Sequence, residues 1–452
     1  MRLKQLLLGL AALTAAIPAT AQTAADTLRL SRRECIGIAL QESPTIRVAD
    51  MEIKRMDYAK KEVIANLFPS IDFSLSYQRT IELQTMSLNM GGQSNKIKMG
   101  MDNNWNTGFS ASMPLVNAAL WKSIKISDTQ ILSTLEEARA SRLDMVDNVN
   151  KAYYALLLAI ASRDVIKENY RLAKETADIY QKQFEQGTAS EYDVLRSSVQ
   201  VKNVEPELLQ ADISVKQCSL QLKVLMGMDN AVEVMPNITL AEMQQEMYGL
   251  APGLNRDIAN NTSLRQLDIQ TKLLDQNVTL KKFAWIPTLG VQFNLAWMSM
   301  SNGNALRNQE FNPYSNVALA LSVPIFSGGS KYYGLKQAQV QRNEMKFQRE
   351  NLVNSLNMQV DLAIDNINRQ VKQISTSKEG VNQARKAHDI MQKSFDIGAA
   401  SYLDLRDSEM ADTQAQLAYL QSIYNYLVST SELEKLLGDD SSFAAANNDS
   451  NK

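Results

Sequence analysis

The sequence predicts an internally duplicated α+β membrane protein, in which long coiled-coil helices form an α-barrel and four strands per chain contribute to a transmembrane β-barrel. Three observations lead to this prediction. The two halves of the chain repeat each other, each half holds two segments of alternating apolar and polar residues, and each holds a long segment nearly free of Pro and Gly. Alternation with a period of two is typical of a sheet whose faces meet different surroundings, and long segments without helix breakers are typical of extended helices.

Residues 1–21 predict a secretory signal peptide that is not part of the fold. Arg2 and Lys4 precede a short apolar run, Leu6–Ile17, and residues 19–21 read Ala-Thr-Ala, the pattern of a cleavage site. We therefore expect an exported mature chain. No later stretch is long and apolar enough to predict a transmembrane helix, so the exported chain is expected either to be soluble or to span a membrane with strands.

Composition and charge argue against several classes of function. The 47 Lys and Arg residues balance 49 Asp and Glu residues, a net charge of -2, whereas a nucleic-acid-binding protein needs a clustered basic face. One His and two Cys leave little for zinc sites or a disulfide scaffold. The chain has no P-loop, nucleophile elbow or Gly-x-Gly-x-x-Gly motif. The sequence therefore predicts no enzyme, no metal and no cofactor.

The duplication is clearest in two segments that share a Gly, a Ser and an Asp at the same spacing. Residues 180–193 read YQKQFEQGTASEYD, and residues 391–404 read MQKSFDIGAASYLD. Further matches extend the repeats to most of the chain. The predicted organisation is a first repeat at 22–230, a connector at 231–254, a second repeat at 255–438 and a disordered tail at 439–452.

Two strands are predicted in each repeat, at 70–78, 105–115, 288–298 and 315–326. The loops within the two pairs, 84–104 and 299–315, are long and polar. Tyr77, Trp105 and Trp297 suit the aromatic belts of a membrane-spanning sheet. The alternation also fits a soluble sandwich, but nothing else in the chain supplies a second sheet. The apolar positions of the predicted strands are Ile71, Phe73, Leu75, Tyr77, Trp105, Phe109, Met113, Leu289, Val291, Phe293, Leu295, Trp297, Val317, Leu319, Leu321, Val323 and Ile325.

A long helical hairpin follows each strand pair, at 118–226 and 330–437. Between Val194 and Leu225, seam residues recur at alternating spacings of three and four, which indicates a coiled coil. Pro206 lies inside this helix, off the seam, and predicts a kink or a locally unwound turn.

The hairpin turns are expected at Gly187 and Gly398, because Gly accommodates the left-handed backbone that ends many helices. Ser190 and Ser401 follow them at the positions where a hydroxyl caps the returning helix. The sequence thus predicts the same turn chemistry in both repeats.

Four strands cannot close a barrel alone, because even the smallest barrels need about eight. An open sheet with an apolar face would leave unpaired edges in lipid, which bilayers do not tolerate. We therefore expect several copies of the chain to form one oligomeric tube.

Together these motifs resemble those of the TolC-like outer-membrane efflux protein family, over nearly the whole mature chain. The motifs that carry the resemblance are Ser43-Pro44, Phe68-Pro69-Ser70, Ile286-Pro287-Thr288, Val323-Pro324-Ile325-Phe326-Ser327-Gly328-Gly329 and the two Gly turns with a following Asp. The resemblance implies a homotrimer whose 12-stranded transmembrane β-barrel lies in the outer-membrane lipid of a Gram-negative cell and whose helical tunnel crosses the periplasm. It implies a passive exit duct of a tripartite efflux pump or a type I secretion system. The implied partners are a periplasmic adaptor protein and an inner-membrane transporter of RND or ABC type.

The resemblance also implies a gate at the periplasmic end. Asp404 and Asp407 match the carboxylates that ring this constriction, and three copies would form two acidic rings that favour cations and raise one another's pKa. Asp193 is the first-repeat counterpart, expected to help hold neighbouring hairpins. Some members have an Arg where this chain has Ala400, with Arg406 nearby in another register. The alternative is that these carboxylates only stabilise helix N-termini.

Several alternatives remain open from the sequence. The rival function is a periplasmic coiled-coil adaptor or scaffold of a transport complex, which would need compact β-rich modules and no lipid-facing strands. Cys35 and Cys218 could pair in an oxidising compartment, although a free thiol is favoured for Cys218 on the heptad seam. His388 also lies on a seam, where a hydrogen-bonded interface role is favoured over pH sensing. The sequence does not identify the cargo.

Overall fold

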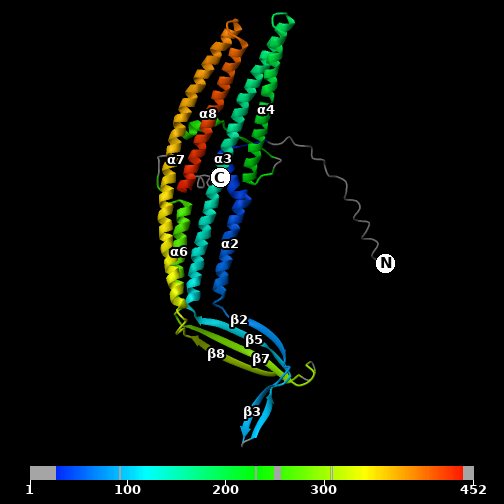
Figure 1. Ribbon diagram of the computed structural model, residues 1–452, viewed down its shortest axis with the longest axis vertical. Coiled ribbons are helices and arrows are strands. Elements are labelled where there is room, and N and C mark those ends of the chain that lie inside the picture. Colours follow the sequence, from blue (N-terminus) through cyan, green and yellow to red (C-terminus); the bar gives the residue numbers. More distant parts are fainter. Residues whose placement is uncertain are drawn as a thin grey trace, which may run out of the picture.

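The computed structural model describes residues 27–440, except 91–92, 230–231, 249–255, 306 and 308. The predicted signal peptide and nearly all of the predicted C-terminal tail lie outside the described residues. Figure 1 shows an elongated molecule, in which long helices stand on one end of a curved sheet and a short hairpin extends from the other end.

The sheet has four antiparallel strands in the order β2-β5-β7-β8. Their bounds are Ser70–Arg79 for β2, Asn103–Val116 for β5, Thr288–Ser301 for β7 and Asn312–Ser322 for β8. The register places Phe109 of β5 opposite both Phe73 of β2 and Leu295 of β7, and directly opposite residues share a face. Pairing of β5 with β7 therefore joins the two repeats in one continuous sheet.

The last predicted strand is displaced toward the N-terminus. It was expected at 315–326, whereas β8 ends at Ser322. Pro324 lacks a backbone N–H and so cannot continue the ladder, and Gly328 and Gly329 adopt positive φ angles before the next helix. The alternation in 323–326 thus extends past the paired part of the strand.

The prediction of a polar loop at 84–104 was wrong. The segment contains strands β3 (Gln84–Met90) and β4 (Gln93–Met99), which form a separate two-stranded antiparallel sheet. Met86 lies opposite Ile97 in its register. In β3, Met and Leu alternate with Ser and Asn, which is the period-two pattern of a strand. The polar residues of the segment led to the prediction of a loop instead.

Two helices run the length of the helical region, α3 (Ala118–Glu185) and α7 (Ser330–Asp396). Four shorter helices lie beside them: α2 (Pro44–Ala65), α4 (Glu191–Met226), α6 (Thr262–Phe283) and α8 (Tyr402–Leu437). Near the sheet the neighbours follow the order α2, α3, α6, α7, and farther away the order is α4, α3, α8, α7 (Figure 1). The helices form a wall whose lateral edges are α7 on one side and α2 with α4 on the other.

No helix in the described part of the chain is both long and apolar enough to cross a membrane. The helix α4 continues through Pro206 without interruption, so the predicted unwinding does not occur there. The prolyl residue removes only one backbone hydrogen bond, which a long packed helix tolerates.

The junction between α8 and α6 is held by Arg139 of α3. Its guanidinium donates to the carbonyl oxygens of Gly438 and Asn260, at 2.8 and 3.0 Å, and to Glu136 at 2.7 Å. Gly438 has a φ of 69°, and a Cβ built there would lie 2.1 Å from the Asn260 carbonyl oxygen. The chain therefore needs Gly at this point, where the two short helices meet end to end.

The main apolar core lies midway along the helical region. It is centred on fully buried residues of α3 and α8, including Tyr153, Leu156, Ile423 and Leu427. It is covered by α1 (Arg32–Glu42) and by a parallel pair formed by β1 (Thr27–Leu30) and β6 (Glu233–Pro236), with α5 (Leu240–Tyr248) nearby. The predicted connector at 231–254 thus includes a strand and a helix that pack on the core.

The two cysteines are free thiols. Cys35 of α1 is fully buried, and burial raises the pKa of its thiol to about 12. Cys218 of α4 is partly buried, and burial also raises its pKa. Both side chains therefore act as packing residues in the fold.

Candidate functional site

One face of the four-stranded sheet is apolar and open to the surroundings. The register places Phe73, Phe109 and Leu295 on it together with Phe293 and Val317 of β7 and β8. Exposed large apolar residues on the two outer strands comprise Ile71, Phe73, Leu75 and Tyr77 of β2 and Val317, Leu319 and Leu321 of β8. An apolar surface of this extent on a sheet requires an apolar environment.

The opposite face carries small, polar and mostly uncharged side chains. Asn294 donates to Asn316 across the strands at 3.0 Å, and the hydroxyls of Ser70 and Ser112 lie 2.9 Å apart. The residues of this face include Asp72, Ser74, Ser76, Asn106, Gly108, Ser110, Ser112, Gln292, Asn294, Ala318 and Ala320. Polar groups at this density suit a water-filled space.

Both edges of the sheet are unpaired in the described chain. The strands β2 and β8 each have one neighbour, β5 and β7 respectively. Their outer N–H and C=O groups need partners, and in an apolar medium each unsatisfied group costs several kcal/mol. The chain is therefore an incomplete wall that other strands must extend.

Aromatic residues mark the end of the apolar face that lies farthest from the helices. The rings of Tyr77 and Trp105 lie 4.6 Å apart between centroids. The Tyr77 hydroxyl donates to Asn103 Oδ1 at 2.7 Å, and Trp105 Nε1 donates to the carbonyl oxygen of Ala305 at 2.9 Å. An apolar ring with a satisfied polar tip suits the boundary between hydrocarbon and water.

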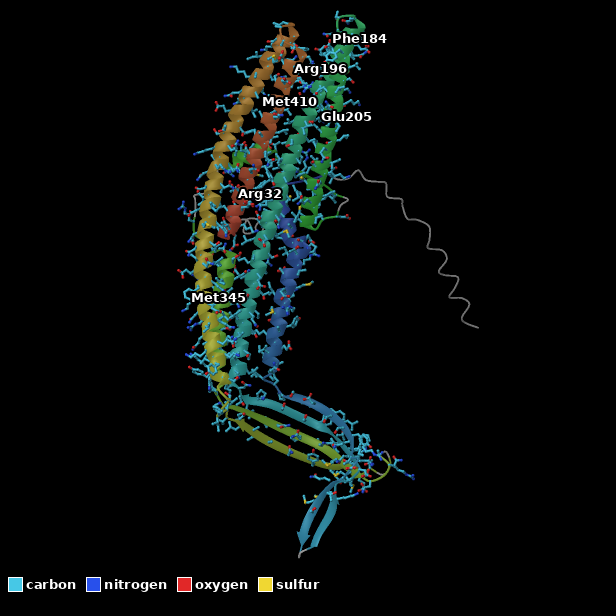
Figure 2. All side chains as sticks on the ribbon, viewed as in Figure 1. Arg32, Phe184, Arg196, Glu205, Met345 and Met410 are labelled. Atoms are coloured by element: carbon cyan, nitrogen blue, oxygen red, sulfur yellow. The ribbon has the colours of Figure 1, made fainter. Side chains whose placement is uncertain are left out.

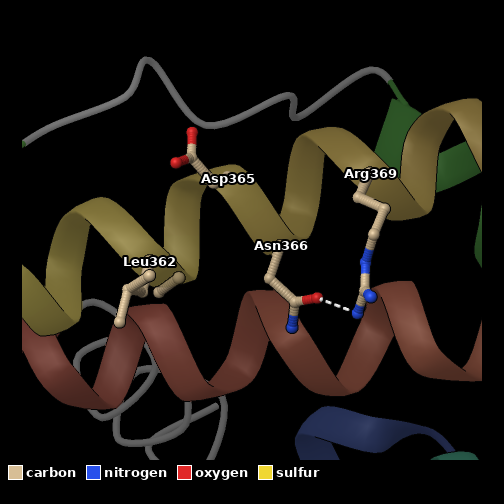
Figure 3. Close-up of a pocket in the computed structure, with 5 residues that line it drawn as sticks. Leu362, Asp365, Asn366 and Arg369 are labelled. Atoms are coloured by element: carbon tan, nitrogen blue, oxygen red, sulfur yellow. Dashed lines mark hydrogen bonds between the residues drawn. The ribbon is translucent and has the colours of Figure 1, made fainter.

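The lateral edges of the helical wall also expose apolar side chains. On α4, Tyr192 is 67% exposed, and on α7, Phe347 is 72% exposed. A shallow hollow of about 470 Å³ lies along α7, where Arg369 donates to Asn366 at 2.6 Å beside the exposed Leu362 (Figure 3). Other exposed apolar residues on these edges are Leu195, Val199, Leu209 and Ile213 of α4 and Val340, Met358 and Val371 of α7.

The two helical hairpins turn at the predicted glycines. Gly187 and Gly398 have φ angles of 77° and 75°. Ser190 and Ser401 cap the returning helices, and each forms a reciprocal pair of hydrogen bonds with the residue three positions later. The duplicated motif at 187–193 and 398–404 is thus a turn followed by a capping box.

The predicted gate carboxylates have different surroundings. Asp404 accepts hydrogen bonds from the backbone N–H of Ser401 at 3.1 Å and from its hydroxyl at 2.6 Å, and these bonds lower the pKa of Asp404. Asp193 makes the same contacts with Ser190. Asp407 is exposed, and among the described contacts it has no hydrogen bond or ion pair. In the single chain the pKa of Asp404 is therefore lowered, because its carboxylate caps a helix; the predicted rise concerns rings formed by several copies and stays a prediction.

An aromatic cluster joins the two hairpins at their tips, a feature that the sequence analysis missed. Tyr180 of α3 packs against Phe395 of α7 and Tyr402 of α8, with centroids 6.3 and 5.5 Å apart. Arg196 of α4 lies 5.3 Å from the centre of the Tyr402 ring. Figure 2 shows Arg196, with Phe184 beyond it at the end of the molecule farthest from the sheet. The available signal was the position of Tyr180 and Phe395 on the heptad seams.

His388 bridges α7 and α8 about two turns farther from the tip. Its Nδ1 lies 3.3 Å from the Ser408 hydroxyl, which donates its only hydrogen to the carbonyl oxygen of Leu405 at 2.6 Å. This contact joins the two helices of the second hairpin through side-chain hydrogen bonding. Glu409 lies nearby, and burial raises its pKa, partly offset by the charge of His388.

Comparison with known proteins identifies the family. The sequence pattern of the outer membrane efflux protein family matches residues 35–228 and 254–439. The chain belongs to this family. Membership confirms the predicted family, the location in the outer membrane and the role in efflux, and it assigns the chain to transport proteins rather than enzymes. The two matched ranges also support the predicted duplication.

The chain is similar to outer membrane protein TolC of Vibrio cholerae, with 20% identity over 73% of this chain and 76% of that protein. It is 23% identical to alkaline protease secretion protein AprF of Pseudomonas aeruginosa, over 91% and 85% of the two chains. Among solved structures, CusC has a TM-score of 0.70 at 17% identity, covering 93% and 95%. The CmeC outer membrane channel of Campylobacter jejuni has a TM-score of 0.69 at 16% identity, covering 96% and 94%. These likenesses confirm the predicted fold class.

Proposed function

We propose that three copies of the chain form the passive exit duct of a tripartite efflux pump or a type I secretion system. The observation that carries this proposal is the sheet, which has one apolar face, one polar face and two unpaired edges. Three four-stranded sheets give a 12-stranded barrel, which is wide enough to leave a water-filled lumen. In that barrel the apolar face meets lipid and the polar face meets cargo.

Neighbouring copies meet along both parts of the wall. The edge strand β2 of one copy pairs with β8 of the next, which satisfies the open backbone groups. Below the membrane the exposed apolar residues of α4 pack against those of the neighbouring α7, including Leu362 at the hollow in Figure 3. The tunnel of helices thus continues the barrel into the periplasm.

The duct moves cargo passively, and an inner-membrane transporter of RND or ABC type supplies the energy through a periplasmic adaptor. The nearly uncharged polar lining of the sheet, in which Asp72 is the charged member, supports a pore of low selectivity. The relative AprF is named for secretion of an alkaline protease, which supports polypeptides as cargo beside small molecules.

The hairpin tips form the periplasmic gate of this duct. The Asp407 carboxylate is free to form a ring around the axis. The carboxylates of Asp404 and Asp193 also accept hydrogen bonds from the serines that cap their helices. Rings of carboxylates attract cations, and the aromatic cluster around Tyr402 holds the two hairpins of each copy together.

Paired cysteines test the assembly. A chain with Ser74→Cys on β2 and Asn316→Cys on β8 should form disulfides between copies and yield covalent trimers on a denaturing gel, since these positions lie on the polar face of the two edges. Ser110→Cys with Asn294→Cys is the matched control, because these residues are opposite each other within one sheet and should give monomers only.

The same preparation separates the proposal from the rival adaptor function. Trimers extracted with detergent should form ion-conducting channels in planar bilayers. A chain that stays monomeric in buffer without detergent and gives no conductance contradicts the proposal and favours an adaptor or scaffold.

A further inference from the structure

The loop that connects β7 to β8 is folded onto the apolar side of the sheet. Asn103, which is fully buried, donates from Nδ2 to the carbonyl oxygens of Ser301 and Gly303, at 3.2 and 3.0 Å. Trp105 Nε1 donates to the carbonyl oxygen of Ala305. Asn103, Trp105 and Ser301 all belong to the face that carries Phe109. The described part of this loop therefore lies on the apolar face of the sheet, away from its polar face.

A second set of amide contacts fixes the far half of the loop. The Ser299 hydroxyl, which is 1% exposed, donates to Gln309 Oε1 at 2.9 Å, and Gln309 Nε2 donates to the Ser301 hydroxyl at 2.6 Å. Asn302 Oδ1 accepts from the backbone N–H of Asp102 at 3.0 Å. The described loop residues on both sides, Asn302, Gly303, Ala305 and Gln309, are thus bonded to the strand ends at the outer rim of the apolar face.

Two exposed arginines lie at this rim. Arg79 is directly opposite Asn103, two positions beyond the Tyr77–Trp105 pair and on the opposite side of that pair from the helices. Arg307 lies in the loop, two residues after Ala305. Asn103 of β5 connects the two positions, because its backbone pairs with Arg79 of β2, one strand spacing of about 5 Å away, and its side chain bonds the Gly303 carbonyl oxygen of the loop. Both arginines thus belong to segments anchored at the Asn103 and Trp105 end of the sheet, and the length of two arginine side chains is enough for both guanidinium groups to reach one bound ligand there.

The two guanidinium groups are available for a ligand. Within the described residues, neither Arg79 nor Arg307 forms an ion pair or a hydrogen bond through its side chain, and the exposed Glu310 of the same loop pairs with neither. Guanidinium groups bind phosphate with paired hydrogen bonds. Tyr77 and Trp105 place them where the apolar face ends, which is the level of lipid headgroups.

We propose that Arg79 and Arg307 bind the phosphate groups of a phosphorylated glycolipid in the outer leaflet, above the ledge formed by Tyr77 and Trp105. This inference rests on the proposed function, because it requires the sheet to span the membrane. It assigns the loop between β7 and β8 a role in anchoring the duct in lipid.

Native mass spectrometry of the detergent-solubilised oligomer tests the inference, with diphosphorylated lipid A and enzymatically dephosphorylated lipid A as probes. The wild-type protein should retain the diphosphorylated form. The double variant Arg79→Gln, Arg307→Gln should bind it at least about tenfold more weakly, since charge-assisted hydrogen bonds each contribute roughly that factor. Arg79→Lys with Arg307→Lys should restore part of the binding.

The matched control is Arg385→Gln with Lys386→Gln, which removes the same charge from exposed positions on α7 and should bind like the wild type. Equal retention of the two lipids, or equal loss in the control, overturns the inference. Displacement of lipid A by millimolar inorganic phosphate also overturns it, because the site would then select a free anion. Channel conductance is measured on the same samples: if no variant conducts, the proposed function fails, whereas conductance with no lipid preference refutes this inference alone.

Discussion

The ring of Tyr180 near the end of α3 packs edge-on against the ring of Tyr402 at the start of α8, with an interplanar angle of 81°. This contact joins the first repeat to the second at the tip of the molecule. Tyr402 is 9% exposed, so the contact is nearly dry. Any opening of the periplasmic end that separates α3 from α8 must break it.

Replacing Tyr402 should therefore weaken the contact between the two hairpins at the tip. Tyr402→Ala removes a buried aromatic ring, which costs about 3 kcal/mol in a packed site, and should raise the basal conductance of channels in planar bilayers. Tyr402→Phe keeps the ring and its edge-on packing and should conduct like the wild type. An unchanged closed state in Tyr402→Ala would remove this contact from the gate.

The carboxylates of the proposed gate, Asp404 and Asp407, should differ in their effects. Asp407→Asn should lower the cation selectivity of the channel, read as a reversal potential in a salt gradient, because Asp407 has no other contact among those described. Asp404→Ala should lower the melting temperature as well, because it removes the hydrogen-bond partner of Ser401. If the double variant Asp404→Ala, Asp407→Ala keeps the selectivity of the wild type, neither residue belongs to the gate.

Burial of Glu409 predicts a specific dependence of stability on pH. Its folded pKa is raised above the ordinary value of 4.5, so the folded state favours the protonated form. The loss of folding free energy that results from ionising the Glu409 carboxyl is absent below pH 4.5. It grows as the pH rises through the folded pKa and is complete above the folded pKa. Glu409→Gln should raise the melting temperature at pH 7 and have a smaller effect at pH 4.

The control for that experiment is Glu205→Gln on α4, which removes an exposed carboxylate paired with Lys202. Exposed pairs contribute little to stability, so this variant should follow the wild-type pH profile. If the melting temperature of Glu409→Gln differs from that of the wild type by the same amount at every pH from 4 to 7, the raised pKa of Glu409 is contradicted.

Loss of Asn103 should release the loop between β7 and β8. Asn103→Ala leaves the Ser301 and Gly303 carbonyl oxygens without their buried donor, which costs about 1–3 kcal/mol. Trypsin should then cut after Arg307 faster than in the wild type. Asn104→Ala, on the opposite face, should leave the cleavage rate unchanged; equal acceleration in both variants would show that the loop is held elsewhere.

Gly398 and Gly438 have similar φ angles but should differ in how well they tolerate replacement by alanine. Gly398→Ala faces open space, so its cost is limited to the left-handed backbone, about 1–2 kcal/mol. Gly438→Ala adds a clash with the Asn260 backbone and should lower the melting temperature more. The order of the two melting temperatures checks this prediction, and a reversed order would contradict the packing at the α8–α6 junction.

Local patterns in the sequence were sufficient for the duplication, the four long strands, the helical hairpins and their turns. Positive φ at Gly187 and Gly398, and capping by Ser190 and Ser401, follow from the chemistry of residues close in the chain. The alternation of apolar residues likewise reports the two faces of a strand without reference to its neighbours.

Tertiary structure decided the relationships between distant residues. Pairing of β5 with β7, the edge-on contact of Tyr180 with Tyr402 and the bonds from Asn103 to the β7–β8 loop join segments about 200 residues apart. Periodicity indicates which face of an element is apolar, but it does not indicate which other element that face meets. That choice depends on burial and hydrogen bonding summed over the whole chain, which is why the sequence alone predicted the parts of the wall and only the folded chain showed how they join.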